Sequence, residues 1–111
     1  MNSSMLFLIG AGVIAAVSIP MILKIVPPNP IYGFRTPSTL SNRALWYRAN
    51  TFAGWALLIG AIASAVLIVG ISRGVLPGVI PEVAAFLLPT VIAVVASFVF
   101  LRKAQAEVER K

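Results

Sequence analysis

A short polar segment between two long apolar stretches holds most of the residues of this chain that could recognise a ligand. It reads Asn-Pro-Ile-Tyr-Gly-Phe-Arg-Thr-Pro over residues 29–37, and Asn42, Trp46 and Asn50 follow it. The guanidinium of Arg35 can make bidentate hydrogen bonds to a carboxylate, a phosphate or backbone carbonyls. Each asparagine amide can both donate and accept. The segment therefore predicts either a polar binding site or a clamp that holds the loop on the next helix.

The candidate site residues share a polar, aromatic or conformationally special character. They are Asn29, Tyr32, Gly33, Arg35, Thr36, Asn42, Trp46 and Asn50. From about Thr39 the chain is expected to be helical, with Ser38 or Thr39 as N-cap. The spacing of four residues from 42 to 50 then forms one stripe, for which an interfacial helix with an aromatic belt is the simpler interpretation. At the membrane boundary Asn50 needs a hydrogen-bond partner, and the candidates are the loop backbone and the side chains of Arg35 and Asn29.

The rest of the composition is typical of a membrane protein. Of the 111 residues, 59% are hydrophobic and 11% are charged, and the mean hydropathy is +0.98. So short a chain has too little interior to bury this apolar surface, so lipid must cover it. An isolated open sheet would leave its backbone donors unsatisfied in lipid, so the apolar windows are expected to be helices. The expected fold is an all-α membrane protein with three transmembrane helices and an ordered polar cytoplasmic loop and interfacial helix between the first two. The expected parts of this single domain are spans at about 5–26, 51–72 and 83–101, the loop and interfacial helix at 27–50, an outer loop at 73–82 and a basic tail at 102–111.

The formal net charge of +6 is concentrated around the first loop and the C-terminus. Lys24, Arg35, Arg43 and Arg48 surround the loop with no acidic residue among them. Because basic loops stay in the cytoplasm, we expect a multi-pass protein of the inner (plasma) membrane with its N-terminus outside and its C-terminus inside. The basic residues then set the topology and contact anionic lipid headgroups, so nucleic acid is not an expected partner.

The residue types that the chain lacks also restrict its chemistry. It contains no cysteine and no histidine, and its three acidic residues lie far from the loop in sequence. A catalytic site needs a nucleophile or a proton-transfer group, and the loop offers only tyrosines and hydroxyls. We therefore expect no enzyme activity, no metal and no cofactor.

Small residues recur at helical spacing in the second apolar window. Ala56, Gly60 and Ser64 lie four residues apart, so they share one face and allow another backbone to approach closely. The face predicts helix packing within or between protomers. Because three spans leave polar loop groups partly uncovered, we expect a homo-oligomer.

At the loop the sequence resembles the SdpI family of small bacterial membrane proteins. The family pattern is Asn-Pro-x-x-Gly-aromatic-Arg-Thr-Pro, then Thr, Asn, Trp and Asn, with the last two at the entry to the next span. The matching residues here are Asn29, Pro30, Gly33, Phe34, Arg35, Thr36, Pro37, Thr39, Asn42, Trp46 and Asn50. The resemblance covers residues 5–72 in detail and the third span by hydropathy.

The resemblance implies a non-enzymatic protein of toxin immunity or membrane-linked signalling. The namesake of the family protects its producer from a secreted toxic peptide and holds a repressor at the membrane. It is longer and has more spans, and this chain is similar to its motif-bearing half. The expected partners are the lipid bilayer, a toxin peptide or cytoplasmic repressor, and an anionic lipid headgroup. Alternatives left open are an oligomeric small-solute or lipid transporter or a membrane-embedded transferase that binds an anionic ligand at Arg35, and a structural subunit that uses the loop only for folding.

Overall fold

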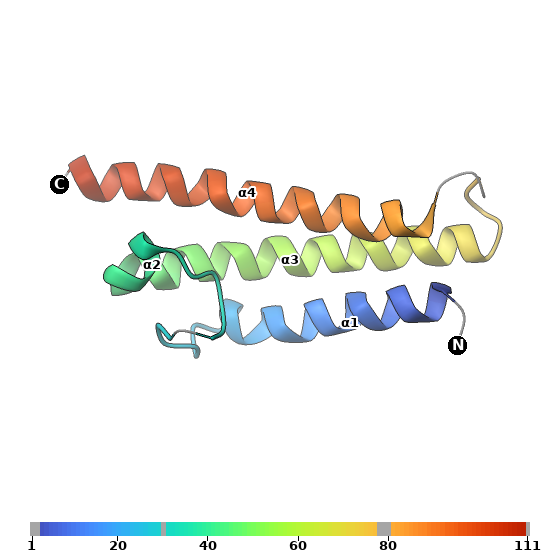
Figure 1. Ribbon diagram of the computed structural model, residues 1–111, viewed down its shortest axis with the longest axis horizontal. Coiled ribbons are helices and arrows are strands. Elements are labelled where there is room, and N and C mark those ends of the chain that lie inside the picture. The colour runs from blue at the N-terminus through green and yellow to red at the C-terminus, as the bar shows by residue number, and fades with distance from the viewer. Residues whose placement is uncertain (1–2, 30, 78–80, 111) are drawn as a thin grey trace.

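The computed structural model describes residues 3–29, 31–77 and 81–110, and every regular element among them is an α-helix. Three are long, α1 (Ser3–Ile22), α3 (Arg43–Ser72) and α4 (Glu82–Arg110), and α2 (Pro37–Ser41) is about one turn. Figure 1 shows α3 in the middle with α1 and α4 on either side. Each long helix is long and apolar enough to cross a membrane. This confirms the expected membrane fold with three spanning helices.

The first span ends in a Schellman motif, before the prolines of the loop. The amide of Ile25 donates to the carbonyl of Pro20 (3.3 Å), and the amide of Lys24 donates to that of Met21 (3.3 Å). Lys24 has a φ of 60°, a left-handed conformation that glycine adopts without a steric penalty. The helix therefore stops at Ile22, short of the end of the apolar window, because the backbone turns away at position 24.

Glycine at position 24 is expected to give a more stable protein than alanine, by about 1 kcal/mol, because only alanine brings a Cβ into the left-handed region. Both variants remove the same charge, so their difference isolates the backbone. Gly12 is the opposite control, since it lies inside α1 with nothing near its Cβ position. There alanine should be more stable than glycine by about 0.5–1 kcal/mol. Thermal unfolding in detergent measures both pairs, and equal stability of the two position-24 variants would contradict the motif.

Small residues let α3 approach both of its neighbours closely. A Cβ on Gly54 would lie 2.9 Å from a backbone oxygen of α1, and one on Gly60 would lie 3.0 Å from the carbonyl oxygen of Pro89 on α4. The hydroxyl of Ser64 donates to the carbonyl of Phe86, also on α4, at 3.1 Å. Two of the three residues of the expected packing face thus pack within this chain. A homo-oligomer stays a prediction, without support from these two residues.

The helices α1 and α4 meet at the end of the bundle where both begin. The hydroxyls of Ser3 and Ser4 donate to the carboxylate of Glu82 at 3.0 and 2.7 Å. The rings of Phe7 and Phe86 lie nearby with their centroids 5.5 Å apart. Toward the other end the two helices diverge, and the segment between α1 and α3 lies there (Figure 1). The divergence makes room for the cavity described below.

The loop end of the bundle also carries most of the basic residues. Arg48 on α3 pairs with Glu107 on α4 at 3.1 Å, and the stacked rings of Phe52 and Phe100 lie 4.3 Å apart beside them. Both partners of the ion pair are exposed, so it contributes at most about 1 kcal/mol. The basic tail is not a separate segment, because α4 continues through it to Arg110. The end of α3 and the beginning of α4 lie at the opposite end of the bundle (Figure 1). The orientation of the protein in the membrane stays a prediction from the charges.

Candidate functional site

Asn29 folds the beginning of the loop into a tight turn. Its Oδ1 accepts hydrogen bonds from the amides of Ile31 (2.9 Å) and Tyr32 (2.7 Å). Its Nδ2 donates to the carbonyls of Pro27 (2.8 Å) and Tyr32 (3.1 Å). An asparagine side chain used in this way replaces part of a backbone turn. Asn29 therefore shapes the loop from within.

Asn50 fastens the middle of the loop to α3. The residue is 2% exposed, and its Oδ1 accepts from the amide of Phe34 at 2.6 Å. Its Nδ2 donates to the carbonyls of Trp46 (2.9 Å) and Phe34 (3.4 Å). The loop backbone, one of the partners expected for Asn50 from the sequence, is the partner in the structure. One buried side chain thus holds both backbone polar groups of Phe34.

Gly33 permits this contact for two separate reasons. Its φ is 102°, a region that side chains other than glycine rarely adopt. A Cβ at position 33 would also lie 2.6 Å from Oδ1 of Asn50 and 3.2 Å from the ring of Trp46. Only a residue without a side chain lets the loop lie so close to α3.

Two aromatic side chains make further hydrogen bonds around the loop, one from α3 to the segment that follows α1 and one from the loop to α1. The indole Nε1 of Trp46, which is fully buried, donates to the carbonyl of Val26 at 2.8 Å. The hydroxyl of Tyr32 donates to the carbonyl of Val17 on α1. A tyrosine hydroxyl keeps its proton at neutral pH, because its ordinary pKa is about 10, and burial raises the pKa of Tyr32 further. The donor in this bond is therefore stable under physiological conditions.

Thr36 and Thr39 begin α2 with a reciprocal capping box. The amide of Thr39 donates to Oγ1 of Thr36 at 3.1 Å, and the amide of Thr36 donates to Oγ1 of Thr39 at 2.8 Å. The N-cap is Thr36, so the expectation of Ser38 or Thr39 is wrong. The helix begins earlier because Pro37 can occupy the first turn, where its missing N–H has no partner to lose.

Asn42 separates α2 from α3, within the region that is expected to be helical from about Thr39. It has extended backbone angles between α2 and α3 (φ −136°, ψ 109°). Its Oδ1 accepts from the amide of Leu45 at 3.1 Å and thereby caps α3. Trp46 and Asn50, one and two turns further on, are then held toward the loop. The three residues spaced four apart thus have two roles. Asn42 caps α3, whereas Trp46 and Asn50 hold the loop.

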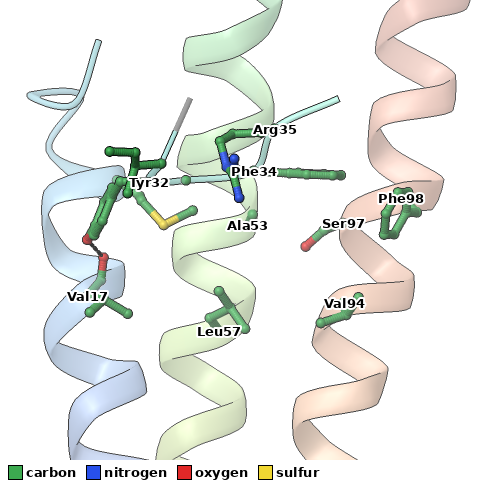
Figure 2. Close-up of a pocket in the computed structure, with 12 residues that line it drawn as sticks. Val17, Tyr32, Phe34, Arg35, Ala53, Leu57, Val94, Ser97 and Phe98 are labelled. Atoms are coloured by element: carbon green, nitrogen blue, oxygen red, sulfur yellow. Dashed lines mark hydrogen bonds between the residues drawn. The ribbon is translucent and has the colours of Figure 1, made fainter. Parts of the chain in front are cut away.

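A cavity of about 480 Å³ lies beneath the loop, where α1 and α4 diverge. The loop forms its roof and the three spanning helices form its walls (Figure 2). The ring of Phe34 meets that of Phe98 edge-on, with centroids 4.9 Å apart, so the roof also contacts α4. Figure 2 shows the guanidinium of Arg35 directed from the loop toward Ala53 on α3. The lining residues are Ile31, Tyr32, Gly33, Phe34 and Arg35 of the loop and Val17, Met21, Ala53, Leu57, Val94, Ser97 and Phe98 of the helices.

The structure separates the eight candidate residues into two groups. Three line the cavity, namely Tyr32, Gly33 and Arg35. The other five hold backbone groups of the loop or the helix ends, and they are Asn29, Thr36, Asn42, Trp46 and Asn50. Of the two roles considered for the asparagines, the clamp is therefore the one seen in the hydrogen bonds, while Arg35 lies where a ligand would reach it.

Sequence reasoning missed the helical walls of the cavity. Their residues are apolar or small, and the sequence gives each of them the same appearance as a residue that faces lipid. Phe34 belongs to the motif, but its contact with α4 had no signal in the local sequence. The walls become recognisable only when α1, α3 and α4 are placed side by side.

Comparison with known proteins assigns the sequence to a family. The chain matches the model of the SdpI/YfhL protein family over residues 24–101. A search of curated proteins and a search of solved structures gave no match. The matched range contains the loop, α3 and most of α4, and it agrees with the resemblance carried by the loop motif. On this match, which covers well over half of its length, the chain belongs to the SdpI/YfhL family.

Proposed function

We propose that this protein is a non-enzymatic immunity protein, which protects its own membrane by binding an apolar toxic peptide at the loop and the cavity beneath it. The observation that carries the proposal is that most residues lining the cavity belong to the part of the chain that matches the family model. Residues 24–101 include the entire roof of the cavity and its walls on α3 and α4. Family membership supports an immunity-like role, and the cavity supplies a place where a membrane-active peptide could be held.

The lining supports binding over catalysis. Its walls are mainly aliphatic and aromatic, and Arg35 adds a cation with several donors at the loop end. Among the described residues that line the cavity there is no carboxylate to act as a general base. Such a site can take an apolar segment together with a carbonyl or anionic end group. In the orientation expected from the charges, the loop lies at the cytoplasmic leaflet.

Signalling through a cytoplasmic partner is a second candidate, favoured by the length of two helices. With 30 residues, α3 is about 45 Å long, whereas the hydrocarbon core of a bilayer is about 30 Å thick. α4 has 29 residues and is similar in length. Their loop-end turns, joined by the Arg48–Glu107 pair, would project from the membrane. A repressor could bind this projection and respond to changes at the loop.

A deletion strain tests the immunity proposal. When the bacterium that encodes the protein lacks the gene, its membrane potential and growth should fall in co-culture with the parent strain, which secretes the toxin. A plasmid copy of the gene should restore both. If the deletion strain grows as well as the parent under every condition in which the gene is expressed, the immunity role is refuted.

Arg35→Lys is expected to leave the melting temperature within about 2 °C of wild type and to reduce protection in the co-culture about tenfold. The charge remains, but a single ammonium cannot reproduce the bidentate geometry of a guanidinium. Arg43→Lys is the matched control, because Arg43 is exposed at the start of α3 and does not line the cavity. If Arg35→Lys loses stability and protection together, Arg35 is a structural clamp.

A further inference from the structure

The cavity has its charged group at one end and apolar walls along its depth. The charged end is the loop, where the guanidinium of Arg35 is directed inward (Figure 2). The deeper walls are aliphatic and include Val17 of α1, Leu57 of α3 and Val94 of α4. An occupant that satisfies both ends carries a polar group at the loop and an apolar tail toward the centre of the bundle. A phospholipid in the leaflet that contains the loop has this orientation.

The cavity opens sideways, into the bilayer, between α1 and α4. Val17, Val94 and Phe98 line it, yet they are 39%, 42% and 48% exposed. Exposed surface on a spanning helix at this depth contacts acyl chains. A lipid can therefore enter from the side, without crossing water.

Arg35 is exposed, yet its guanidinium is directed toward Ala53, on the cavity side of the loop, at what we expect to be a membrane surface (Figure 2). Long basic side chains there usually extend outward, so that the charge reaches headgroups and water. On α4 the first charged residue after the apolar stretch is Arg102, and Val94 lies about two turns, or ~12 Å, deeper. The cavity thus reaches into the hydrocarbon edge, where a cation favours an anionic group close to it.

We propose that the cavity holds one anionic phospholipid, with its phosphate at Arg35 and an acyl chain along the helical walls. Its volume of about 480 Å³ falls within the range of about 300–1,000 Å³ that is typical of ligand sites. The described lining residues include a cation and no carboxylate, which selects an anionic lipid over a zwitterionic one. The lipid is the resident occupant of an undisturbed membrane, so the inference does not depend on the immunity role.

Native mass spectrometry of the protein, released from nanodiscs of equal parts phosphatidylcholine and phosphatidylglycerol, tests the proposal. The wild type should retain one phosphatidylglycerol, about tenfold in preference to phosphatidylcholine. Arg35→Gln should abolish the preference, because the phosphate loses its charged donor. Val94→Trp should reduce retention of both lipids, because the indole fills the deeper part of the cavity.

Ile92→Trp is the matched control for the filling variant. Ile92 is 66% exposed on the same helix and lines a different groove between α3 and α4. It should retain phosphatidylglycerol as the wild type does. If Val94→Trp does not fold, as judged by circular dichroism, Val94→Phe is the smaller substitute and should give the same result.

A second measurement separates a lipid from a free anion. In detergent, phosphatidylglycerol should raise the melting temperature, whereas inorganic phosphate and glycerol 3-phosphate at the same concentration should not. Equal stabilisation by the tailless anions, or equal retention of the two lipids by the wild type, would overturn the lipid proposal. If the wild type retains phosphatidylglycerol as expected but the deletion strain grows as well as the parent, the immunity role alone is refuted.

Discussion

Gly33→Ala is expected to destabilise the protein by about 2–4 kcal/mol, which is enough to lower the melting temperature by roughly 10 °C. Alanine must adopt a φ of 102°, and its Cβ would lie 2.6 Å from Oδ1 of Asn50. Asn50 is buried and bonded on both sides of its amide, so it cannot move away without breaking those bonds. Thermal unfolding in detergent measures the effect.

Gly74→Ala separates the two causes. Gly74 also has a positive φ, 77°, but nothing lies within 4 Å of its Cβ position. Its replacement should cost only the conformational term, about 1 kcal/mol. In an Asn50→Ala background Gly33→Ala should cost little more than Gly74→Ala, because the clashing oxygen is gone. Equal costs for the two glycines in the wild-type background would mean that Gly33 does not approach Asn50 so closely.

Asn50→Leu is expected to destabilise the protein by about 2–4 kcal/mol and to release the loop. The amide of Phe34 would lose its acceptor in a buried place, and an unsatisfied buried amide costs about 1–3 kcal/mol by itself. The carbonyl of Phe34 would lose a donor as well. Trypsin should then cleave after Arg35 faster than in the wild type, which reports on the loop directly.

Thr51→Val is the control for this variant on the next residue of α3. Oγ1 of Thr51 is buried and has no hydrogen-bond partner among the described residues. Replacing it with a methyl group of the same shape should be neutral or slightly stabilising. If the Asn50→Leu protein resists trypsin and has the same melting temperature as the Thr51→Val protein, the Asn50 clamp contributes nothing to stability or to the order of the loop.

The spans of this fold were predictable, because hydropathy over about 20 residues depends only on composition along the chain. The hydrogen bond between Asn50 and the loop backbone was also predictable, since a buried amide at that depth must find a partner nearby. The end of α1 was not, because Lys24 in a left-handed conformation has no sequence signal comparable to that of glycine. The spans and the Asn50 contact follow from general rules of hydropathy and burial. The conformation of Lys24 does not follow from such a rule.

The cavity shows why the rest of the site escaped prediction. Its walls on α1 and α4 come from segments far apart in the sequence, and each wall residue is an ordinary apolar residue of a spanning helix. Which face of such a helix meets protein and which meets lipid depends on packing, through contacts such as the close approach of Gly54 to α1 and of Gly60 to α4. The loop motif identifies the roof, whereas the walls follow from tertiary structure.

The order of synthesis determines when the loop can be attached to α3. Asn50 follows Phe34 by 16 residues, so the loop leaves the ribosome before the residue that fastens it. At roughly 5–20 residues per second this delay is about 1–3 s. Phe98, which contacts the roof from α4, is made later still. A truncated product that ends after α3 would therefore insert two spans and fasten its loop, and yet it would lack one wall of the cavity.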